Sequence, residues 1–259
     1  MEQLTYARLP EDVRPTMRSC RFRGCVVTEQ LDRRADLTRL QILQAASRQF
    51  ARTPYSLVSL DDILADAQVT KGALYFHFRS KHALACAIVE YHAAQARDTT
   101  EDVAARNLSG LETLIDISYQ LAVDDVSDPM TRAGLNLIES IGRTENLGAK
   151  VVTDWVARFS AIGRRAVSEG DLTPDSDPDV VARLLVSLYL GVRQTSELED
   201  PQRFLQDLER SWQLVLPGIA NPDRLGYLRQ FIRRRTTLTA RKAVPLHPEP
   251  PAHTRAGSA

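Results

Sequence analysis

The chain has 259 residues, 43% of them hydrophobic, and its 33 basic and 33 acidic side chains balance at neutral pH. This length is enough for one or two domains with a real core, and no run approaches the roughly 18 apolar residues that would span a bilayer. The N-terminus lacks the continuous apolar stretch of a secretory signal, so we expect a cytoplasmic protein with no membrane partner.

Disulfide, metal and catalytic chemistry are not indicated by the sequence. Its three cysteines are too few for a disulfide framework. Cys20 and Cys25 resemble half of a zinc site, but no second pair of Cys or His ligands follows at a suitable spacing. No nucleophile elbow, phosphate-binding loop or paired histidine motif is present, so we expect no metal, no cofactor and no catalytic residues.

The balanced total hides an uneven distribution of charge. Residues 31–82 carry 8 basic and 5 acidic side chains, whereas residues 83–223 carry 12 basic and 23 acidic ones. Residues 224–242 carry 7 basic side chains and no acidic ones. A basic end on an acidic body orients a protein on DNA and keeps the body away from the phosphates.

The N-terminal segment and the first predicted helix differ in pattern. Residues 1–30 have no helical or strand period, and we expect a disordered arm. The first helix is predicted to start at Asp36 or Thr38 and to stop at Pro54, which cannot continue a helix. Its buried side is expected to carry Leu40, Leu43, Ala46 and Phe50, with Ile42 beside them.

Two short helices follow, each preceded by a residue that caps helices well. Ser59 is predicted to cap the first, which extends to Ala67, and Thr70 is predicted to cap the second. On the second helix, Leu74 and Phe78 share the inward side. Two short helices joined by a tight turn predict a helix-turn-helix, a motif that places its second helix in the DNA major groove.

The rest of the chain is predicted to be helical as well. Ser80 caps a long helix that runs to about Arg106. No stretch alternates with a period of two, so we expect an all-α fold, followed by a Pro-rich polar tail after Leu238. Further helical segments are predicted at residues 111–123, 129–141, 150–168, 179–198 and 201–216.

The stretch Gly-Ala-Leu-Tyr-Phe-His-Phe at 72–78, followed by Ser80 and Lys81, closely resembles the DNA-binding domain of the TetR family. The resemblance extends from about Thr38 to Ala85. The segment Arg-Ala-Gly-Leu-Asn-Leu at 132–137 and the pair Asp154-Trp155 further resemble the gamma-butyrolactone receptors of filamentous actinobacteria, which belong to that family.

Two positions depart from the family pattern. The first helix usually ends at a Gly before an aromatic residue, but here Pro54 precedes Tyr55. The turn between the two short helices usually reads Ala-Gly-Val, but here Gln68 takes the place of Gly, and a left-handed Gln is less favourable than Gly. The turn, and with it the docking angle on DNA, is expected to be adjusted.

The resemblance implies a division of the chain into functional parts. An arm at 1–30 precedes a three-helix, helix-turn-helix DNA-binding domain at 31–82. A helical ligand-binding and dimerisation domain follows at 83–220, and a basic, then Pro-rich tail occupies 221–259.

The candidate DNA contacts lie mainly on the exposed edge of the second short helix. Lys71 and Thr70 are expected to reach base edges, Tyr75 and His77 to reach the backbone with their polar tips, and Lys81 to bind a phosphate. The alternative is that the aromatic residues here, Tyr75, Phe76 and Phe78, simply fill a small core, which we favour for Phe78 but not for Tyr75. The complete set of candidates is Arg34, Ser59, Thr70, Lys71, Gly72, Tyr75, His77 and Lys81, with Arg33 and Arg39 as further arm cations that are equally consistent with a solvated charge run.

The ligand site is expected around Trp155. The family resemblance places a Trp after an acidic residue in the ligand cavity, and the alternative is that Trp155 only fills the core. The other candidates are apolar or aromatic residues with a few hydrogen-bonding tips, as a small neutral ligand requires. They are Tyr119, Gln120, Leu137, Tyr189 and Gln194.

Two helical faces are candidates for self-association, and the family resemblance implies a homodimer that uses them. The alternative is that both faces pack within one chain. One face carries Val180, Leu184, Ser187, Leu188 and Gly191, and the other carries Phe204, Leu208, Trp212 and Val215.

The resulting hypothesis is a repressor that leaves a palindromic operator when a small signalling molecule binds. The signal is expected to be a gamma-butyrolactone, a furan or a butenolide, and the target genes to be those of antibiotic or secondary-metabolite production. A regulator that answers to an antibiotic or an efflux substrate stays open, as does a DNA-binding protein with no ligand.

Overall fold

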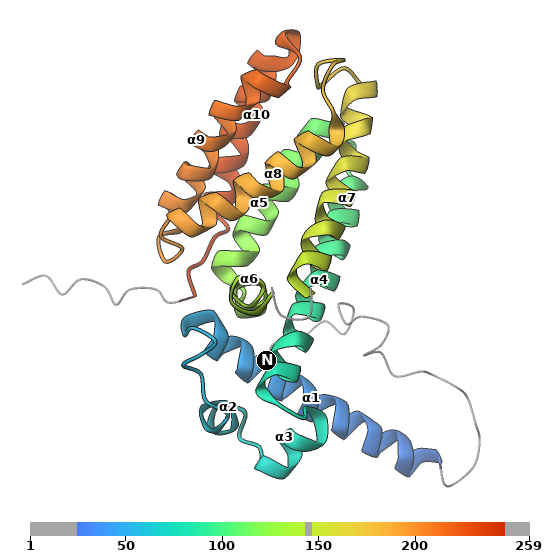
Figure 1. The fold of residues 1–259 in the computed structure, drawn as a ribbon, viewed down its shortest axis with the longest axis vertical. Coiled ribbons are helices and arrows are strands. Elements are labelled where there is room, and N and C mark those ends of the chain that lie inside the picture. The colour runs from blue at the N-terminus through green and yellow to red at the C-terminus, as the bar shows by residue number, and fades with distance from the viewer. Residues whose placement is uncertain (1–24, 143–146, 247–259) are drawn as a thin grey trace, which may run out of the picture. The chain divides into compact units, whose positions relative to one another are not determined.

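The computed structural model describes residues 25–142 and 147–246, and within these ranges the chain forms ten α-helices and one isolated antiparallel bridge, between Leu172 and Ala220. The expected all-α fold is confirmed, and no described helix is long and apolar enough to cross a membrane. The helices are α1 (Cys25–Arg52), α2 (Leu60–Ala67), α3 (Lys71–His77), α4 (Lys81–Ala104), α5 (Gly110–Ser127), α6 (Pro129–Ile141), α7 (Leu147–Ser168), α8 (Pro178–Thr195), α9 (Pro201–Ile219) and α10 (Pro222–Ala240) (Figure 1).

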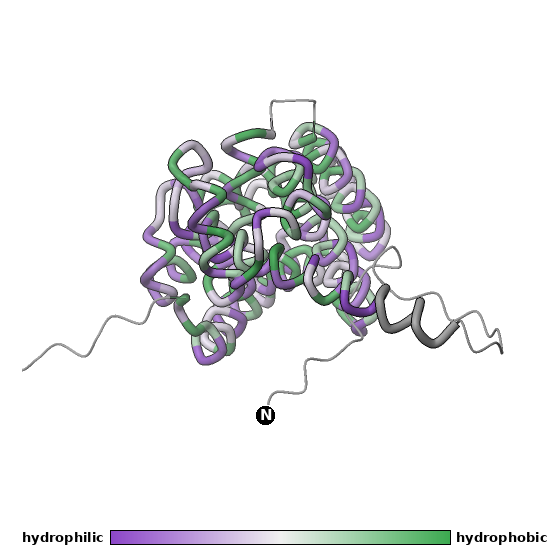
Figure 2. Tube along the Cα trace, turned by 90° about the horizontal axis from the view of Figure 1, so that it is seen from below, coloured by the Kyte–Doolittle hydropathy of each residue, from purple (hydrophilic) through white to green (hydrophobic). Residues whose placement is uncertain are grey.

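The helices form two compact units, which we describe separately. The first unit contains α1 to α4, α6 and the start of α7, and the second contains α5, the rest of α7 from Trp155, and α8 to α10. In the first unit α1 packs against α2, α3, α4 and α6, and α6 also packs against α4. Figure 2 shows hydrophobic and hydrophilic residues alternating along individual helices, as expected for helices with one buried side.

Helix α1 starts at Cys25, well before the predicted start at Asp36 or Thr38. The sequence of this first part has no apolar period, so the periodic pattern did not reveal the helix, but no Gly or Pro interrupts residues 26–53. The predicted stripe is confirmed further on, where Ile42 is 0% exposed and Phe50 1% exposed.

The three predicted N-terminal caps in the first unit are confirmed. The side chain of Ser59 accepts from the backbone N–H of Asp62, and that of Thr70 accepts from Ala73. Ser80 caps α4 in the same way. These bonds satisfy N–H groups that have no partner within the helix, and they fix where α2, α3 and α4 begin.

The departure at Pro54 is compensated from α6. A helix carbonyl normally accepts from the N–H four residues later, and Pro54 has no N–H to give to Phe50. Instead, the side-chain amide of Asn136 donates to the carbonyl oxygen of Phe50 at 3.0 Å. Nearby, α6 approaches α4 closely at Gly134, where an added Cβ would lie only 2.4 Å from the Cβ of His92.

In the second unit, residues 222–240, which the sequence analysis placed in a basic tail, form helix α10. Leu228 and Ile232 of α10 are fully buried, and the helix packs against α5 and α9. Asn221 caps α10 and Pro222 occupies its first turn, as Asp177-Pro178 and Asp200-Pro201 do for α8 and α9. This start signal was visible in the sequence, whereas the many arginines hid the apolar period. The Pro-rich residues 247–259 lie outside the described part.

Candidate DNA interface and ligand site

Helix α3 separates a buried side from an exposed edge, as predicted. Leu74 and Phe78 anchor it to the first unit with exposed fractions of 0% and 4%. Tyr75 is 44% exposed, and Lys71 and Gly72 are exposed beside it. The polar tips along this edge are therefore available to a partner outside the unit, which is the arrangement that a recognition helix needs.

Phe76 is an exposed residue of this edge that the candidate list omitted. Its side chain is 79% exposed, and this exposure is unusual because the ring is large and apolar. Since a helix turns by about 100° per residue, Phe76 lies far from both Leu74 and Phe78, and this spacing was the available signal. An exposed apolar ring on such an edge can contact the methyl groups of thymine.

Gly72 has no steric role within the unit. A Cβ placed on it would meet nothing nearer than the hydroxyl oxygen of Thr70, 4.0 Å away. The free space at the start of α3 therefore faces outward, where a close approach of another backbone benefits from a missing side chain. Thr70 itself is exposed, but its hydroxyl oxygen also accepts the capping bond from Ala73.

His77 lies at the end of α3 and is half-buried between the rings of Phe76 and Phe78. Burial lowers the pKa of its imidazole, the nearby Arg39 guanidinium lowers this pKa further, and Asp36 opposes the shift. His77 thus favours the neutral form, in which one ring nitrogen donates and the other accepts.

Lys81, predicted to bind a phosphate, is held by the protein itself. Its ammonium nitrogen donates to the carbonyl oxygens of Tyr55 at 2.8 Å and Val58 at 2.9 Å, in the loop between α1 and α2. It also lies 4.5 Å from the centroid of the Tyr55 ring. Two of its three N–H groups are therefore used to fasten this loop, which leaves at most one for a phosphate.

Arg34 and Ser59 are both exposed, on α1 and at the start of α2. Arg34 is part of a helix rather than of an arm, and Thr38 donates to its carbonyl oxygen. The hydroxyl of Ser59 accepts from the N–H of Asp62 and lies 2.6 Å from the Asp62 carboxylate. A contact of Ser59 with DNA would compete with this cap.

Three aromatic ligand candidates are buried in the second unit. Trp155 on α7 is 9% exposed, Tyr119 on α5 is 1% exposed and Tyr189 on α8 is 6% exposed. The hydroxyl of Tyr119 is hydrogen-bonded to that of Thr236 on α10 at 2.7 Å. Burial raises the pKa of both tyrosines, so each stays a neutral hydrogen-bonding group.

Tyr189 belongs to a buried charged cluster that the sequence did not reveal. Arg193 donates through Nε to Asp125 at 2.8 Å, and the side chains of this pair are 3% and 0% exposed. The hydroxyl of Tyr189 donates to the same carboxylate oxygen at 3.5 Å. Such a pair is stable only when both partners remain, because removing one leaves a buried charge. Tyr189 therefore has a structural contact whether or not it touches a ligand.

The two glutamines are less enclosed than the aromatic candidates. Gln120 is half-buried, and its side-chain amide donates to Asp124 on the same helix at 3.0 Å. Gln194 is exposed on α8. Their roles toward a ligand remain predictions.

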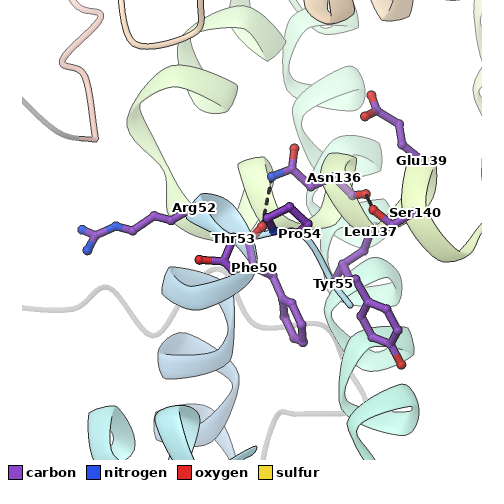
Figure 3. Close-up of a pocket in the computed structure, with 9 residues that line it drawn as sticks. All are labelled: Phe50, Arg52, Thr53, Pro54, Tyr55, Asn136, Leu137, Glu139 and Ser140. Atoms are coloured by element: carbon purple, nitrogen blue, oxygen red, sulfur yellow. Dashed lines mark hydrogen bonds between the residues drawn. The ribbon is translucent and has the colours of Figure 1, made fainter. Parts of the chain in front are cut away.

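Leu137, the sixth candidate, lines a cavity of about 280 Å³ in the first unit (Figure 3). The cavity lies between the end of α1, the following loop and α6, and the other five candidates do not line it. Figure 3 shows the Asn136 amide beside the chain at Thr53 and Pro54, with the rings of Phe50 and Tyr55 below. The cavity is lined by Phe50, Arg52, Thr53, Pro54, Tyr55, Asn136, Leu137, Glu139 and Ser140.

The structure describes only some of the residues on which the metal prediction depends. Cys20 and the side chain of Cys25 lie outside the described residues, so the half zinc site is not described. In the part of the chain that the structure describes, no three His, Cys, Asp or Glu side chains gather as a metal site would require.

Comparisons with known proteins agree with the geometry of α3. Residues 42–88 match the model of bacterial regulatory proteins of the tetR family, and residues 108–221 match the tetracyclin repressor-like C-terminal domain. The A-factor receptor protein of Streptomyces griseus is 31% identical over 197 residues, which are 76% of this chain and 68% of the receptor. The chain belongs to the TetR family. It is a DNA-binding transcriptional regulator and not an enzyme.

Solved structures place this TetR-family regulator close to one branch of the family. A gamma-butyrolactone receptor described as an ArpA-like protein is 32% identical, with a TM-score of 0.69, over 79% of this chain and 99% of the other. CprB from Streptomyces coelicolor, solved with its biological operator sequence, is 33% identical with a TM-score of 0.65, over 81% of this chain and 98% of CprB.

The two faces considered for self-association differ in this TetR-family chain. On α8, Val180 is 62% exposed and Leu184 is 41% exposed, and Ser187 and Gly191 are exposed in the same row. On α9, in contrast, Phe204, Leu208 and Trp212 are at most 1% exposed, so these residues pack within their own unit. The outward side of α9 instead presents Leu214, which is 83% exposed.

Proposed function

We propose that this regulator is a homodimeric repressor that binds a palindromic operator through α3 and leaves it when a gamma-butyrolactone-type signal binds. The observation that carries the proposal is the exposed edge of α3 on a chain that matches gamma-butyrolactone receptors over nearly their whole length. The target genes are those of antibiotic or secondary-metabolite production. One solved relative is described as showing the molecular basis for the control of antibiotic production by bacterial hormones. The site of action is the cytoplasm.

The DNA contacts of the proposal lie on α3 and beside it. Lys71 and Thr70 read base edges, Tyr75 and His77 contact the backbone, and Gly72 lets the backbone approach. Arg34, Ser59 and Lys81 complete the set at the periphery. Two half-sites about 34 Å apart would each receive one α3 of the dimer. The exposed row on α8 and the outward side of α9 form the dimer interface.

The signal binds in the second unit against Trp155, with Tyr119, Gln120, Tyr189 and Gln194 as further contacts. A small neutral lactone suits neutral aromatic groups with few polar tips. Release follows if the ligand has a higher affinity for a dimer state in which the recognition helices no longer fit both half-sites.

A fluorescence experiment tests the ligand site. The chain has two tryptophans, and Trp212→Phe leaves Trp155 as the only reporter. Trp212 itself donates to the hydroxyl of Ser118, so this variant is first checked for an unchanged melting temperature. Addition of A-factor, used as a synthetic gamma-butyrolactone probe, is expected to change the Trp155 emission and to release operator DNA in a gel-shift titration.

The response variant separates the alternatives. Trp155→Ala is expected to bind the operator normally and to ignore the lactone. Normal release of Trp155→Ala by the lactone would contradict the proposed site. Release of the wild type by an antibiotic but not by lactones would favour a drug-responsive regulator, and operator binding that no small molecule alters would favour a protein without a ligand.

A further inference from the structure

The basic side chains of α10 and the residues just after it fall into two groups. Arg224 pairs through Nε with Asp171 at 3.0 Å, and Arg235 pairs through Nε with Asp116 at 3.0 Å. The two carboxylates are nearly buried, with exposed side-chain fractions of 1% and 6%. These two arginines therefore hold α10 against the rest of the second unit.

The other five cations have no such role. None of them forms an ion pair with a carboxylate of the described residues, and four of the five are exposed while Arg229 is half-buried. No acidic residue occurs between positions 224 and 242 to neutralise them. We name this group the α10 ridge. It consists of Arg229, Arg233, Arg234, Arg241 and Lys242.

The ridge extends along the second part of α10 and just past its end. Arg229 and Arg233 are four residues apart and are neighbours on the helix surface, and Arg241 and Lys242 follow directly after the last residue of α10, Ala240. At 1.5 Å per residue, the ridge extends over about 20 Å. A DNA duplex presents about one phosphate charge per 1.7 Å of its axis, so several phosphates lie within reach of a row of this length.

We propose that the α10 ridge binds the phosphate backbone of a nucleic acid, as a second contact surface distinct from α3. Arginine suits this partner because its planar fork donates two parallel hydrogen bonds to phosphate oxygens. Because none of the five forms an ion pair with a described carboxylate, no such pair has to break first.

The surroundings of the ridge argue against other partners. A protein interface needs a central cluster of large apolar or aromatic anchors. The exposed large residues near the ridge, Tyr227, Leu238 and Val244, are instead separated along the chain by the small or polar exposed residues Gln230 and Thr237 and by the ridge cations themselves. A helix that binds a lipid surface inserts its apolar side. The apolar side of α10, which carries Leu228 and Ile232, is buried in the unit.

The salt dependence of non-specific DNA binding tests the proposal in the full chain. Lys71→Ala with Tyr75→Ala first removes the contribution of α3, and a labelled random-sequence duplex of 20 base pairs serves as the probe. Adding Arg233→Gln and Arg234→Gln is expected to reduce the slope of log affinity against log salt by about 2, since each released counterion contributes about 0.9. Melting temperatures confirm that the variants fold.

A matched control removes two arginines that already face carboxylates. Arg164 and Arg203 belong to the same unit, are 61% exposed, and lie 3.5 Å from Asp179 and 3.8 Å from Glu197. Arg164→Gln with Arg203→Gln is expected to leave the slope nearly unchanged. Equal slopes for the ridge variant and this control would overturn the proposal.

Competitors identify the kind of anion. Polyglutamate that displaces the duplex as effectively as unlabelled DNA would show a general anion site and would also overturn the proposal, as would tighter binding to anionic phosphatidylserine vesicles than to the duplex. In a chain with α3 intact, the ridge variant keeps its preference for the operator over random DNA, so a failure of the ridge is distinguishable from a failure of α3.

Discussion

The side-chain amide of Asn136 lies 3.0 Å from the carbonyl oxygen of Phe50 and 3.4 Å from that of Ala51, and donates to both. The last carbonyls of a helix have no partner within it, and Pro54 removes the donor that Phe50 would otherwise meet. Asn136 therefore connects α6 to the end of α1, the helix against which α2 and α3 pack.

Asn136→Ala is expected to lower the free energy of unfolding by about 1 kcal/mol, because it removes a hydrogen bond to a carbonyl without a substitute. Chemical denaturation measures the change. Ser140→Ala is the control, since among the described residues the Ser140 hydroxyl bonds only to the carbonyl of Asn136 on its own helix. In a Pro54→Ala background, where a backbone N–H is restored, Asn136→Ala should have a smaller effect. An equal effect in both backgrounds would contradict this account.

Lys81→Ala is expected to lower the melting temperature, because two loop carbonyls lose the donor that fastens them. The sequence alone predicted a different effect, a salt slope flatter by about one unit. Lys71→Ala is the comparison, since Lys71 is exposed and should change the salt slope but not the melting temperature. An unchanged melting temperature for Lys81→Ala would mean that its ammonium serves DNA instead.

Phe76→Ala and Phe78→Ala are expected to separate recognition from folding. Phe76 is 79% exposed, so its removal should leave stability unchanged and reduce discrimination between operator and random DNA. Phe78 is 4% exposed, so its removal should destabilise the chain by roughly 3–5 kcal/mol. Thermal denaturation and gel-shift titration of both variants measure these effects, and a Phe76→Ala protein with normal operator preference would refute the role given to Phe76.

Gln68 ends α2 in the left-handed conformation, with φ of 53° and ψ of 39°. Gly adopts this conformation without steric penalty, whereas a β-branched side chain fits it poorly. The expected order of stability is Gln68→Gly above wild type above Gln68→Val, with steps of about 1 kcal/mol. Urea denaturation determines the order, and a less stable Gln68→Gly would show that Gln68 makes a compensating contact.

The depressed pKa of His77 makes stability depend on pH in a defined direction. Its ordinary value is 6.5, and burial, followed by the charge of Arg39, lowers it in the folded state. The unfolded chain therefore takes up the proton first, so the stabilisation is fully present above pH 6.5 and is lost as the pH falls below that value. Unfolding measured from pH 5 to 8 should show a smaller loss for His77→Gln than for wild type. Parallel curves would contradict the assignment.

The sequence predicted most of what depends on neighbouring residues. The caps at Ser59, Thr70 and Ser80 and the inward side of α3 are local features, set by hydrogen bonds and sterics within a few residues. The turn at Gln68, which was expected to be adjusted, keeps the left-handed conformation. Helix α10 was also locally signalled by Asn221-Pro222, but the arginines around its apolar positions made the segment look like a tail.

What the sequence by itself determined is the family, the all-α fold and the exposed edge of α3, because each follows from periodic burial and capping along a short stretch of chain. Only the tertiary structure decided how individual polar groups are used. It assigned Lys81 to the loop carbonyls, Asn136 to the end of α1 and Arg193 to Asp125, pairs that lie 23 to 86 residues apart in the chain. The residue type fixes which hydrogen-bond donors a side chain has. The acceptor that each donor reaches depends on how distant segments pack, and no local sequence pattern contains that information.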